Sequence, residues 1–144
     1  MSVLPQGVAS VRVLVVDDNA DVLGALESRL RREPGLHLTG SLACADSLVE
    51  TVKRLAPDVV LLDLDMPGRE PLGALADLTR EHPRTRVIIL SGHVRRELID
   101  RSVSAGAWGY LSKNDDFAGI AAAVRRVMEG EMVLSPEVQA ALGT

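Results

Sequence analysis

The sequence predicts an α/β fold in which helices cover both faces of a parallel sheet. Short runs rich in Val, Leu and Ile alternate along the chain with stretches whose apolar residues recur at the helical period. Aromatic residues make up only 2% of the chain although 47% of its residues are hydrophobic, so the core must be aliphatic, which suits a buried parallel sheet. The 144 residues are enough for one domain with a single core.

The strands are expected where β-branched and aliphatic residues form runs that are too short for a helix. Such runs occupy residues 11–16, 59–62, 87–90 and 107–111, and a weaker run occupies 36–42. A stretch of helical pattern separates each run from the next. This alternation predicts five repeats of strand and helix, joined as βαβ units with right-handed crossovers.

The helices are expected where apolar residues return every three or four positions, which places them on one face. The stretch from about 95 to 104 is the weakest of the five, because its apolar positions are few. The other four patterns are Leu23, Leu26 and Leu30; Leu48, Val52 and Leu55; Leu72, Leu75 and Leu78; and Phe117, Ile120, Val124 and Val127.

Residues 11–130 are therefore expected to form the domain, with 1–10 as a lead-in. Residues 131–144 are expected to be a tail or the start of a linker to an output domain that this sequence does not contain. Within that tail, Ser135 and Pro136 form a helix-start signal and Gly143 is placed to end the helix, because serine is a favoured cap and proline fits the first turn.

Charge and composition exclude several classes of function. The formal net charge is −4, and charges of both signs are mixed along the chain, so strong binding of nucleic acid by this chain is not expected. The single cysteine cannot form an internal disulfide. No apolar run approaches the ~20 residues that cross a bilayer. These features predict a cytoplasmic protein without a membrane segment.

Polar residues with chemical potential follow four of the expected strands. Asp17 and Asp18 come directly after the first strand, Asp63 after the third, Ser91 after the fourth, and Lys113 two residues after the fifth. The carboxyl ends of parallel strands lie along one edge of a sheet, where open α/β folds bind their ligands. If the strand order is 2-1-3-4-5, the first and third strands are neighbours and the three aspartates converge.

Three converging carboxylates repel one another unless a hard cation lies among them. Mg²⁺ is the expected ion, because it prefers oxygen ligands and keeps several waters. Lys113 is one of only two lysines among 16 basic residues, so a compact ammonium at this position is less readily explained as an ordinary surface charge. Together with the hydroxyl of Ser91, it suits the oxygens of a phosphoryl group.

Four segments carry a resemblance to a known family. They are Val15-Val16-Asp17-Asp18-Asn19, Asp63-Leu64-Asp65-Met66-Pro67-Gly68, Leu90-Ser91-Gly92 and Gly109-Tyr110-Leu111-Ser112-Lys113. In this order they resemble the motif regions of response-regulator receiver domains of two-component systems, over about residues 10–130. The resemblance implies a flavodoxin-like (βα)5 fold, a doubly wound parallel sheet of order 2-1-3-4-5.

The resemblance also implies a role for each motif residue. A sensor histidine kinase would transfer a phosphoryl group to Asp63, and the domain would later remove it without turning over small molecules. Asp18 would bind Mg²⁺ directly, Asp17 partly through water, and Asp65 through its backbone carbonyl. The remaining roles are Ser91 as the switch hydroxyl, Lys113 as the charge partner of the phosphoryl group, and Tyr110 as the aromatic switch that turns inward.

The sequence is most similar to the NarL/FixJ-type, or LuxR-type, subfamily. Asn114 follows Lys113 where many receivers have a proline, which leaves the geometry of the Lys113–Asn114 bond open. Members of this subfamily usually continue into a helix-turn-helix domain, so DNA binding and transcriptional output are expected only through such a domain. A phosphorylation-dependent homodimer is a further expectation, with an output surface between Arg95 and Met128.

Two alternatives remain at the level of sequence. A degenerate receiver keeps the fold as a binding module without being phosphorylated. A phosphatase of the haloacid-dehalogenase type is favoured only by the spacing of Asp63 and Asp65, which in that family follow the first strand and not the third. Asp65 and His93 each lie two residues beyond a motif residue, and both are expected to flank the path of the hydrolytic water.

Overall fold

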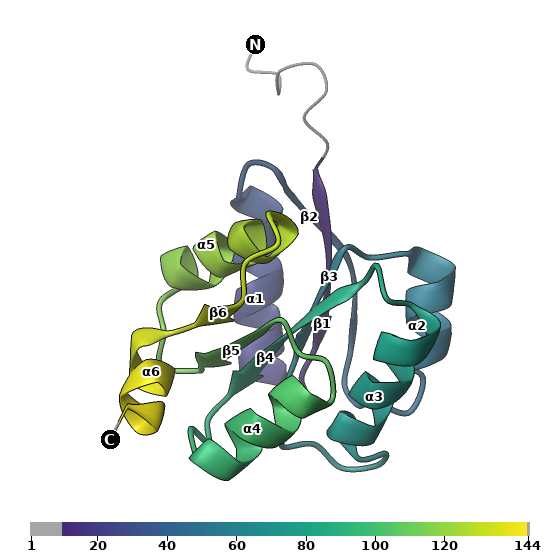
Figure 1. Cartoon of the computed structure of the whole chain (residues 1–144). Helices are drawn as coiled ribbons and strands as arrows, with labels where there is room; N and C mark the ends of the chain where they lie inside the picture. The colour runs from purple at the N-terminus through teal and green to yellow at the C-terminus, as the bar shows by residue number, and fades with distance from the viewer. Residues whose placement is uncertain (1–9, 144) are drawn as a thin grey trace.

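A parallel sheet of six strands runs through the protein in the order β2-β1-β3-β4-β5-β6 (Figure 1). The computed structural model describes residues 10–143. The strands are β1 (Val11–Val16), β2 (Leu36–Leu42), β3 (Val59–Leu62), β4 (Arg86–Ser91), β5 (Gly109–Ser112) and β6 (Val133–Leu134). The predicted order of the first five strands is confirmed, and β6 is an additional strand beside β5.

Helices cover both faces of this sheet, as predicted (Figure 1). They are α1 (Ala20–Arg32), α2 (Leu48–Leu55), α3 (Pro71–Glu81), α4 (Arg96–Ser104), α5 (Phe117–Met128) and α6 (Pro136–Leu142). The buried side chains of α1 and α5 pack on one face, and those of α2, α3 and α4 pack on the other. None of the helices in residues 10–143 is both long and apolar enough to cross a membrane.

The core is aliphatic because consecutive residues of each strand point to opposite faces. In β1, Val13 and Val15 pack with α1 and α5, whereas Leu14 and Val16 pack with the helices of the other face. All four residues of β3 are buried, as expected for a strand at the centre of a parallel sheet. This arrangement holds the carboxyl ends of β1 and β3 side by side.

The strand predicted over 107–111 begins later, at Gly109. The residues before it form the turn after α4, where Gly106 has a positive φ of 110° and lies against the side chain of Thr79. A glycine is required at this position, because an added Cβ would meet the Thr79 hydroxyl oxygen at 2.1 Å. The turn therefore delays the strand and carries the chain into β5.

Residues 133–142 form a sixth strand and helix that pack on the sheet. The Ser135 amide donates to the Tyr110 carbonyl oxygen at 3.2 Å, and the fully buried Val138 joins the core beside α4. The Arg96 guanidinium of α4 donates to the Leu142 carbonyl oxygen near the end of α6. The predicted helix after Ser135, with Gly143 following its last residue, is confirmed.

Candidate functional site

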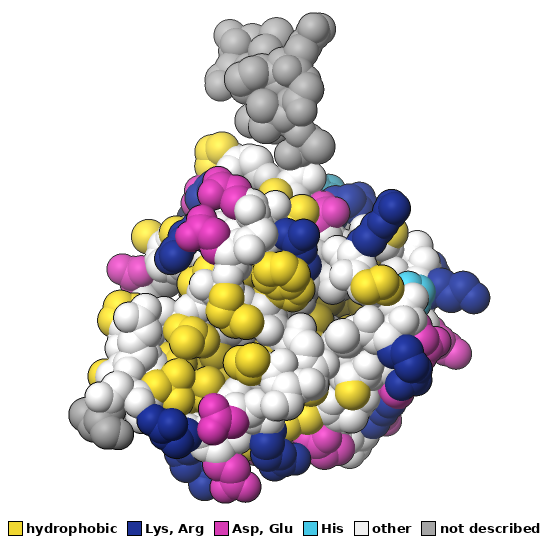
Figure 2. Space-filling model, in the orientation of Figure 1, with side chains coloured by type: hydrophobic (Ala, Val, Ile, Leu, Met, Phe, Trp, Pro, Cys, Tyr) yellow, Lys and Arg dark blue, Asp and Glu magenta, His cyan; other side chains and the backbone are white. Residues whose placement is uncertain are grey.

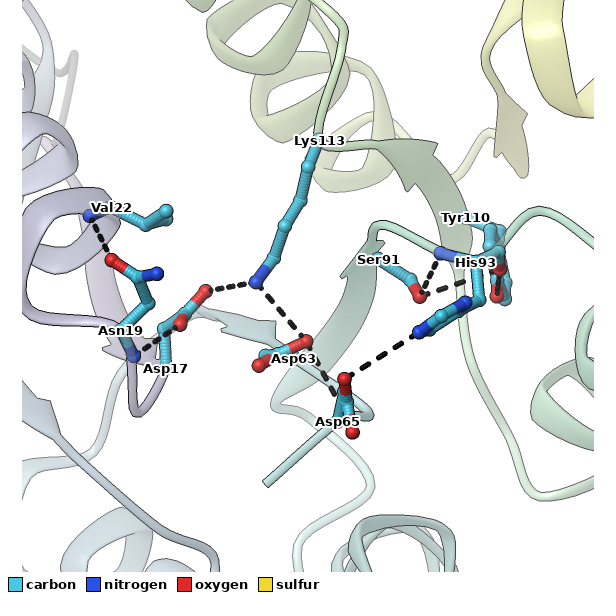
Figure 3. Close-up of polar contacts among 9 residues, drawn as sticks. All are labelled: Asp17, Asn19, Val22, Asp63, Asp65, Ser91, His93, Tyr110 and Lys113. Carbon is cyan, nitrogen blue, oxygen red and sulfur yellow. Dashed lines mark hydrogen bonds and ion pairs between the residues drawn. The ribbon is translucent and has the colours of Figure 1, made fainter.

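The polar residues predicted at the strand ends converge at one edge of the sheet (Figure 3). The Asp63 amide donates to the Val16 carbonyl oxygen at 2.9 Å, which ties the end of β3 to the end of β1. Asp17, Asp18 and Asp63 each offer a carboxylate oxygen, and these three atoms lie within 4.8 Å of one another. The convergence of the three aspartates follows from the adjacency of β1 and β3.

The start of α1 fixes Asp17 in position. Asn19 caps this helix, with its side-chain oxygen accepting from the amides of Asp21 and Val22 at 3.0 and 3.1 Å. The Asn19 amide in turn donates to Asp17 Oδ1 at 2.9 Å. Because the first amides of a helix lack partners within the helix, an Asn cap is favourable here. The same turn leaves the neighbouring Asp18 exposed to solvent.

Asp63 is almost completely buried, with 2% of its surface exposed. Its Oδ1 accepts from the Asp65 amide at 3.2 Å and lies 3.3 Å from Lys113 Nζ. Burial raises the pKa of the Asp63 carboxyl above its ordinary value, and the charge of Asp17 adds to this effect. The Asp65 amide and the Lys113 ammonium lower the pKa but do not cancel the rise.

Lys113 extends from the end of β5 between the two buried carboxylates (Figure 3). Its ammonium lies 2.8 Å from Asp17 Oδ2 in addition to the contact with Asp63. Burial lowers the pKa of Lys113, but the hydrogen bond to Asp17 and the charges of both aspartates outweigh burial and raise it above its usual value. The lysine therefore stays charged at neutral pH. All peptide bonds in residues 10–143, including Lys113–Asn114, are trans.

Ser91 and Tyr110 form a second group, which meets at His93 rather than at the carboxylates (Figure 3). The Ser91 hydroxyl oxygen accepts from the His93 amide at 3.0 Å, and the Tyr110 hydroxyl donates to the His93 carbonyl oxygen at 2.5 Å. Both side chains are fully buried. Burial raises the pKa of Tyr110, so its hydroxyl remains a donor at neutral pH. Tyr110 thus lies in the inward position.

A cavity of about 290 Å³ opens over the acidic cluster. Asp18, Asp63 and Lys113 line it together with Asp65 and His93, among others. The exposed side chains of Asp65 and His93 lie 3.5 Å apart, measured from Oδ2 to Nε2. They therefore form one wall of the entrance to Asp63.

The acidic cluster is compatible with a divalent metal ion. Its donors are carboxylate oxygens, which hard cations prefer. Oδ2 of Asp63 is buried and has no hydrogen-bond partner among residues 10–143. A buried acceptor without a partner is costly, and a cation or an incoming electrophile would remove that cost.

A family model described as the response regulator receiver domain matches residues 13–125. The chain belongs to this family. The transcriptional regulatory protein DesR of Bacillus subtilis is 32% identical over 128 residues, which cover 89% of this chain and 63% of that protein. The response regulator GacA of Pseudomonas aeruginosa is also 32% identical over 128 residues, which cover 89% and 60%. The chain thus spans about three fifths of the length of these curated relatives.

Solved structures of receiver domains share the fold. A two-component response regulator of the LuxR family from an Aurantimonas species has a TM-score of 0.88 at 24% identity, covering 94% of this chain and 96% of that one. The response regulator ChrA of a heme-sensing two-component system has a TM-score of 0.78 at 30% identity, covering 93% and 64%. These findings confirm the predicted resemblance to receiver domains of the NarL and LuxR type.

The family assigns a general role to this receiver domain. Receiver domains act in two-component signalling with sensor histidine kinases and are generally not small-molecule enzymes. Of the curated relatives named above, DesR is a transcriptional regulatory protein and GacA is a response regulator.

Two residues near Lys113, Ser112 and Asp115, have contacts that the sequence did not predict. Asp115 accepts from the Ser112 amide at 3.1 Å, and the Ser112 hydroxyl oxygen accepts from the Asn114 amide at 3.0 Å. The available signal was the pair Asp115-Asp116 before α5. Only Asp116 is the N-cap of that helix, so the other aspartate was free to bind elsewhere.

Proposed function

We propose that this receiver domain accepts a phosphoryl group from a sensor histidine kinase on Asp63. The buried Oδ2 of Asp63, which has no partner among the described residues, carries the proposal. It lies on a carboxylate that Lys113 contacts through the other oxygen and that opens into a cavity. As the new oxygen–phosphorus bond to Asp63 forms, the phosphorus–nitrogen bond to the kinase histidine breaks.

The chain's own residues provide positioning and charge for this transfer. The Asp65 amide holds Oδ1 of Asp63, which fixes the orientation of the carboxylate. Lys113, already between Asp17 and Asp63, supplies a positive charge for the phosphoryl oxygens. Mg²⁺ held by the side chains of Asp17, Asp18 and Asp63 and by the Asp65 carbonyl would neutralise charge on the transferring group.

The output step follows from the second group of residues. The Ser91 hydroxyl would turn from the His93 amide toward the phosphoryl group, and Tyr110 would stay locked inward. Because both contact the segment that leads into α4, the change alters the surface formed by α4, β5 and α5. We propose that this surface forms a homodimer or releases a helix-turn-helix domain that residues 131–144 connect to residues 11–130. A role in regulating transcription would be consistent with a cytoplasmic location.

Intact-mass analysis with Mg²⁺ and a small phosphodonor such as acetyl phosphate tests the proposal. We expect one phosphoryl adduct in the native chain and none in Asp63→Asn. Asp100→Asn is the control, because Asp100 is an exposed aspartate on α4 and should label normally. An adduct that persists in Asp63→Asn would contradict the assignment of the site.

The same experiment separates the two alternatives. A chain that takes no label under any donor behaves as a phosphorylation-independent binding module. Rapid turnover of many phosphate esters, without a lasting adduct, would identify a phosphatase.

A further inference from the structure

The turn that carries Lys113 is held by its own side chains. The Lys113 amide donates to the Ser91 carbonyl oxygen at 2.9 Å, which is the last link of the turn to β4. Beyond it, the Asn114 amide donates to the Ser112 hydroxyl oxygen, and the Asp115 amide donates to the Ser112 carbonyl oxygen, both at 3.0 Å. Asp115 Oδ2 closes the turn by accepting from the Ser112 amide at 3.1 Å.

The end of β6 explains why Ser112 needs this carboxylate. On that side of the sheet, β6 pairs only with Gly109 and Tyr110 of β5. The Ser112 amide lies beyond this pairing, yet Ser112 is only 1% exposed. Leaving a buried amide without a hydrogen-bond partner is costly, so an acceptor from outside the sheet is required. The half-buried Asp115 provides it.

Two adjacent aspartates in this loop accept hydrogen bonds from different backbone amides. Asp116 Oδ1 accepts from the Gly119 amide at 2.8 Å and caps α5. Asp115 instead accepts from the amide of Ser112, the residue before Lys113. Each carboxylate thus satisfies one backbone amide, but only that of Asp115 closes the turn from which the Lys113 side chain extends.

We infer that Asp115 is a positioning residue for Lys113, acting through the Ser112 amide. Without the Asp115 carboxylate, the Ser112 amide has to donate its hydrogen bond to water, and the turn opens. The Lys113 ammonium then leaves its place 2.8 Å from Asp17 and 3.3 Å from Asp63. The consequence for phosphoryl transfer rests on the proposed function, whereas the position of the ammonium does not.

NMR of protein labelled only at lysine tests the position directly. The chain has two lysines, so the exposed Lys53 serves as an internal reference for the side-chain signals of Lys113. We expect Asp115→Ala to move the Lys113 signals toward those of Lys53. Asp115→Asn keeps an oxygen acceptor and should leave them near their native place. Asp116→Ala, the matched control, should lower thermal stability without moving them.

Phosphorylation by acetyl phosphate supplies the functional readout. Because small misplacements of a catalytic group cost up to about 100-fold in rate, we expect Asp115→Ala to slow labelling by about tenfold and Asp115→Asn by less than about twofold. In a Lys113→Ala background, Asp115→Ala should cause no further decrease, because the two residues act as one unit.

The outcomes test the positioning role of Asp115 separately from the proposed phosphorylation of Asp63. Unmoved Lys113 signals in Asp115→Ala, or equal movement in Asp115→Ala and Asp116→Ala, would overturn the positioning role. An additive decrease in the Lys113→Ala background would overturn it as well. If the signals move as expected but the native chain takes no label, the positioning role is supported and the proposed phosphorylation is contradicted.

Discussion

Two buried carboxylates, those of Asp17 and Asp63, share the ammonium group of Lys113. The single positive charge of Lys113 does not neutralise both carboxylates. The exposed Asp18 adds a third negative charge at the same edge of the sheet. The site is therefore electrostatically unfavourable without a bound cation. This imbalance predicts how stability responds to pH and to substitution.

Replacing Asp63 with Asn is expected to stabilise the fold at neutral pH. Because the pKa of Asp63 is raised from its ordinary value of 3.8, its contribution to stability is complete below that pH and is lost as pH rises through the folded-state pKa. In buffer without divalent cations, Asp63→Asn should melt a few degrees higher than the native chain at pH 7. The two melting temperatures should converge near pH 3.

Asp77→Asn provides a control of opposite sign. Hydrogen bonds from Arg69 and Arg80 lower the pKa of Asp77, so its contribution is present above pH 3.8 and is lost as pH falls. This variant should melt lower than the native chain at pH 7. A lower melting temperature for Asp63→Asn as well would show that the Asp63 charge is fully compensated.

Asp65→Asn is expected to change the lifetime of the phosphoryl group. Asp65 and His93 line the entrance to Asp63, so they would flank the path by which water reaches the proposed acyl phosphate. We expect the decay rate of the adduct, followed by mass spectrometry after removal of the donor, to change by about threefold or more. Asp100→Asn should decay like the native chain, and an unchanged rate in Asp65→Asn would exclude a role in hydrolysis.

The convergence of Asp17, Asp18 and Asp63 could be predicted because the order of parallel strands determines which strand ends meet. The bond between Asp115 and the Ser112 amide could not, because it depends on where β6 stops pairing with β5. That stop, at Leu134, lies 22 residues after Ser112 in the chain. Local sequence does not encode which buried amide will lack a partner.

At the scale of elements, β1 and β3 were predictable from runs of valine and leucine, which only Arg12 of β1 interrupts. β6 has only two residues, which is too short for any periodic pattern, so the predicted fold had five strands. α4 gave a weak signal for a related reason, since Ile99 and Ser102 are its only buried residues. Contacts with the sheet and with α6 define β6 and α4 more than the sequence patterns of these two elements do.

Val138→Ala tests whether α6 is an integral part of the fold. Val138 is fully buried in the core beside α4, so the variant leaves a cavity. Denaturant unfolding should show a loss of about 2 kcal/mol. Glu137→Ala, on the exposed face of the same helix, should change stability by less than about 0.5 kcal/mol. Equal effects would mean that α6 is not docked.

Across the whole molecule, the proposed phosphorylation site and the proposed output surface are linked through His93. Its amide binds Ser91 beside Asp63, and its carbonyl oxygen binds Tyr110 of β5. β5 in turn pairs with β6, so β6 and α6 are also connected to His93 through Tyr110. Figure 2 shows hydrophobic side chains gathered over these strands between α5 and α4, with charged side chains around them. Such a patch suits contact with another protein surface.

Backbone amide NMR of the phosphorylated chain tests this link. Beyond the site itself, we expect shifts in α4, β5, β6 and α6, because each is connected to His93 or Tyr110. Amides of α2 should stay in place, since that helix packs beside β2 and α3. Changes confined to α2 and α3 would contradict an output surface on α4, β5 and α5. Asp63→Asn treated in the same way should show no shifts.

The shortness of β6 limits how two copies of this protein would associate at that edge of the sheet. A free sheet edge invites a strand from another chain, and such edges lead to aggregation when they are long and flat. Here the outermost strand offers two residues and is followed within two positions by Pro136, which has no amide hydrogen to donate. A sheet therefore cannot continue from one molecule into the next across this side. A dimer formed there would rely on packing between helix side chains, which the proposed phosphorylation would adjust without unfolding a strand.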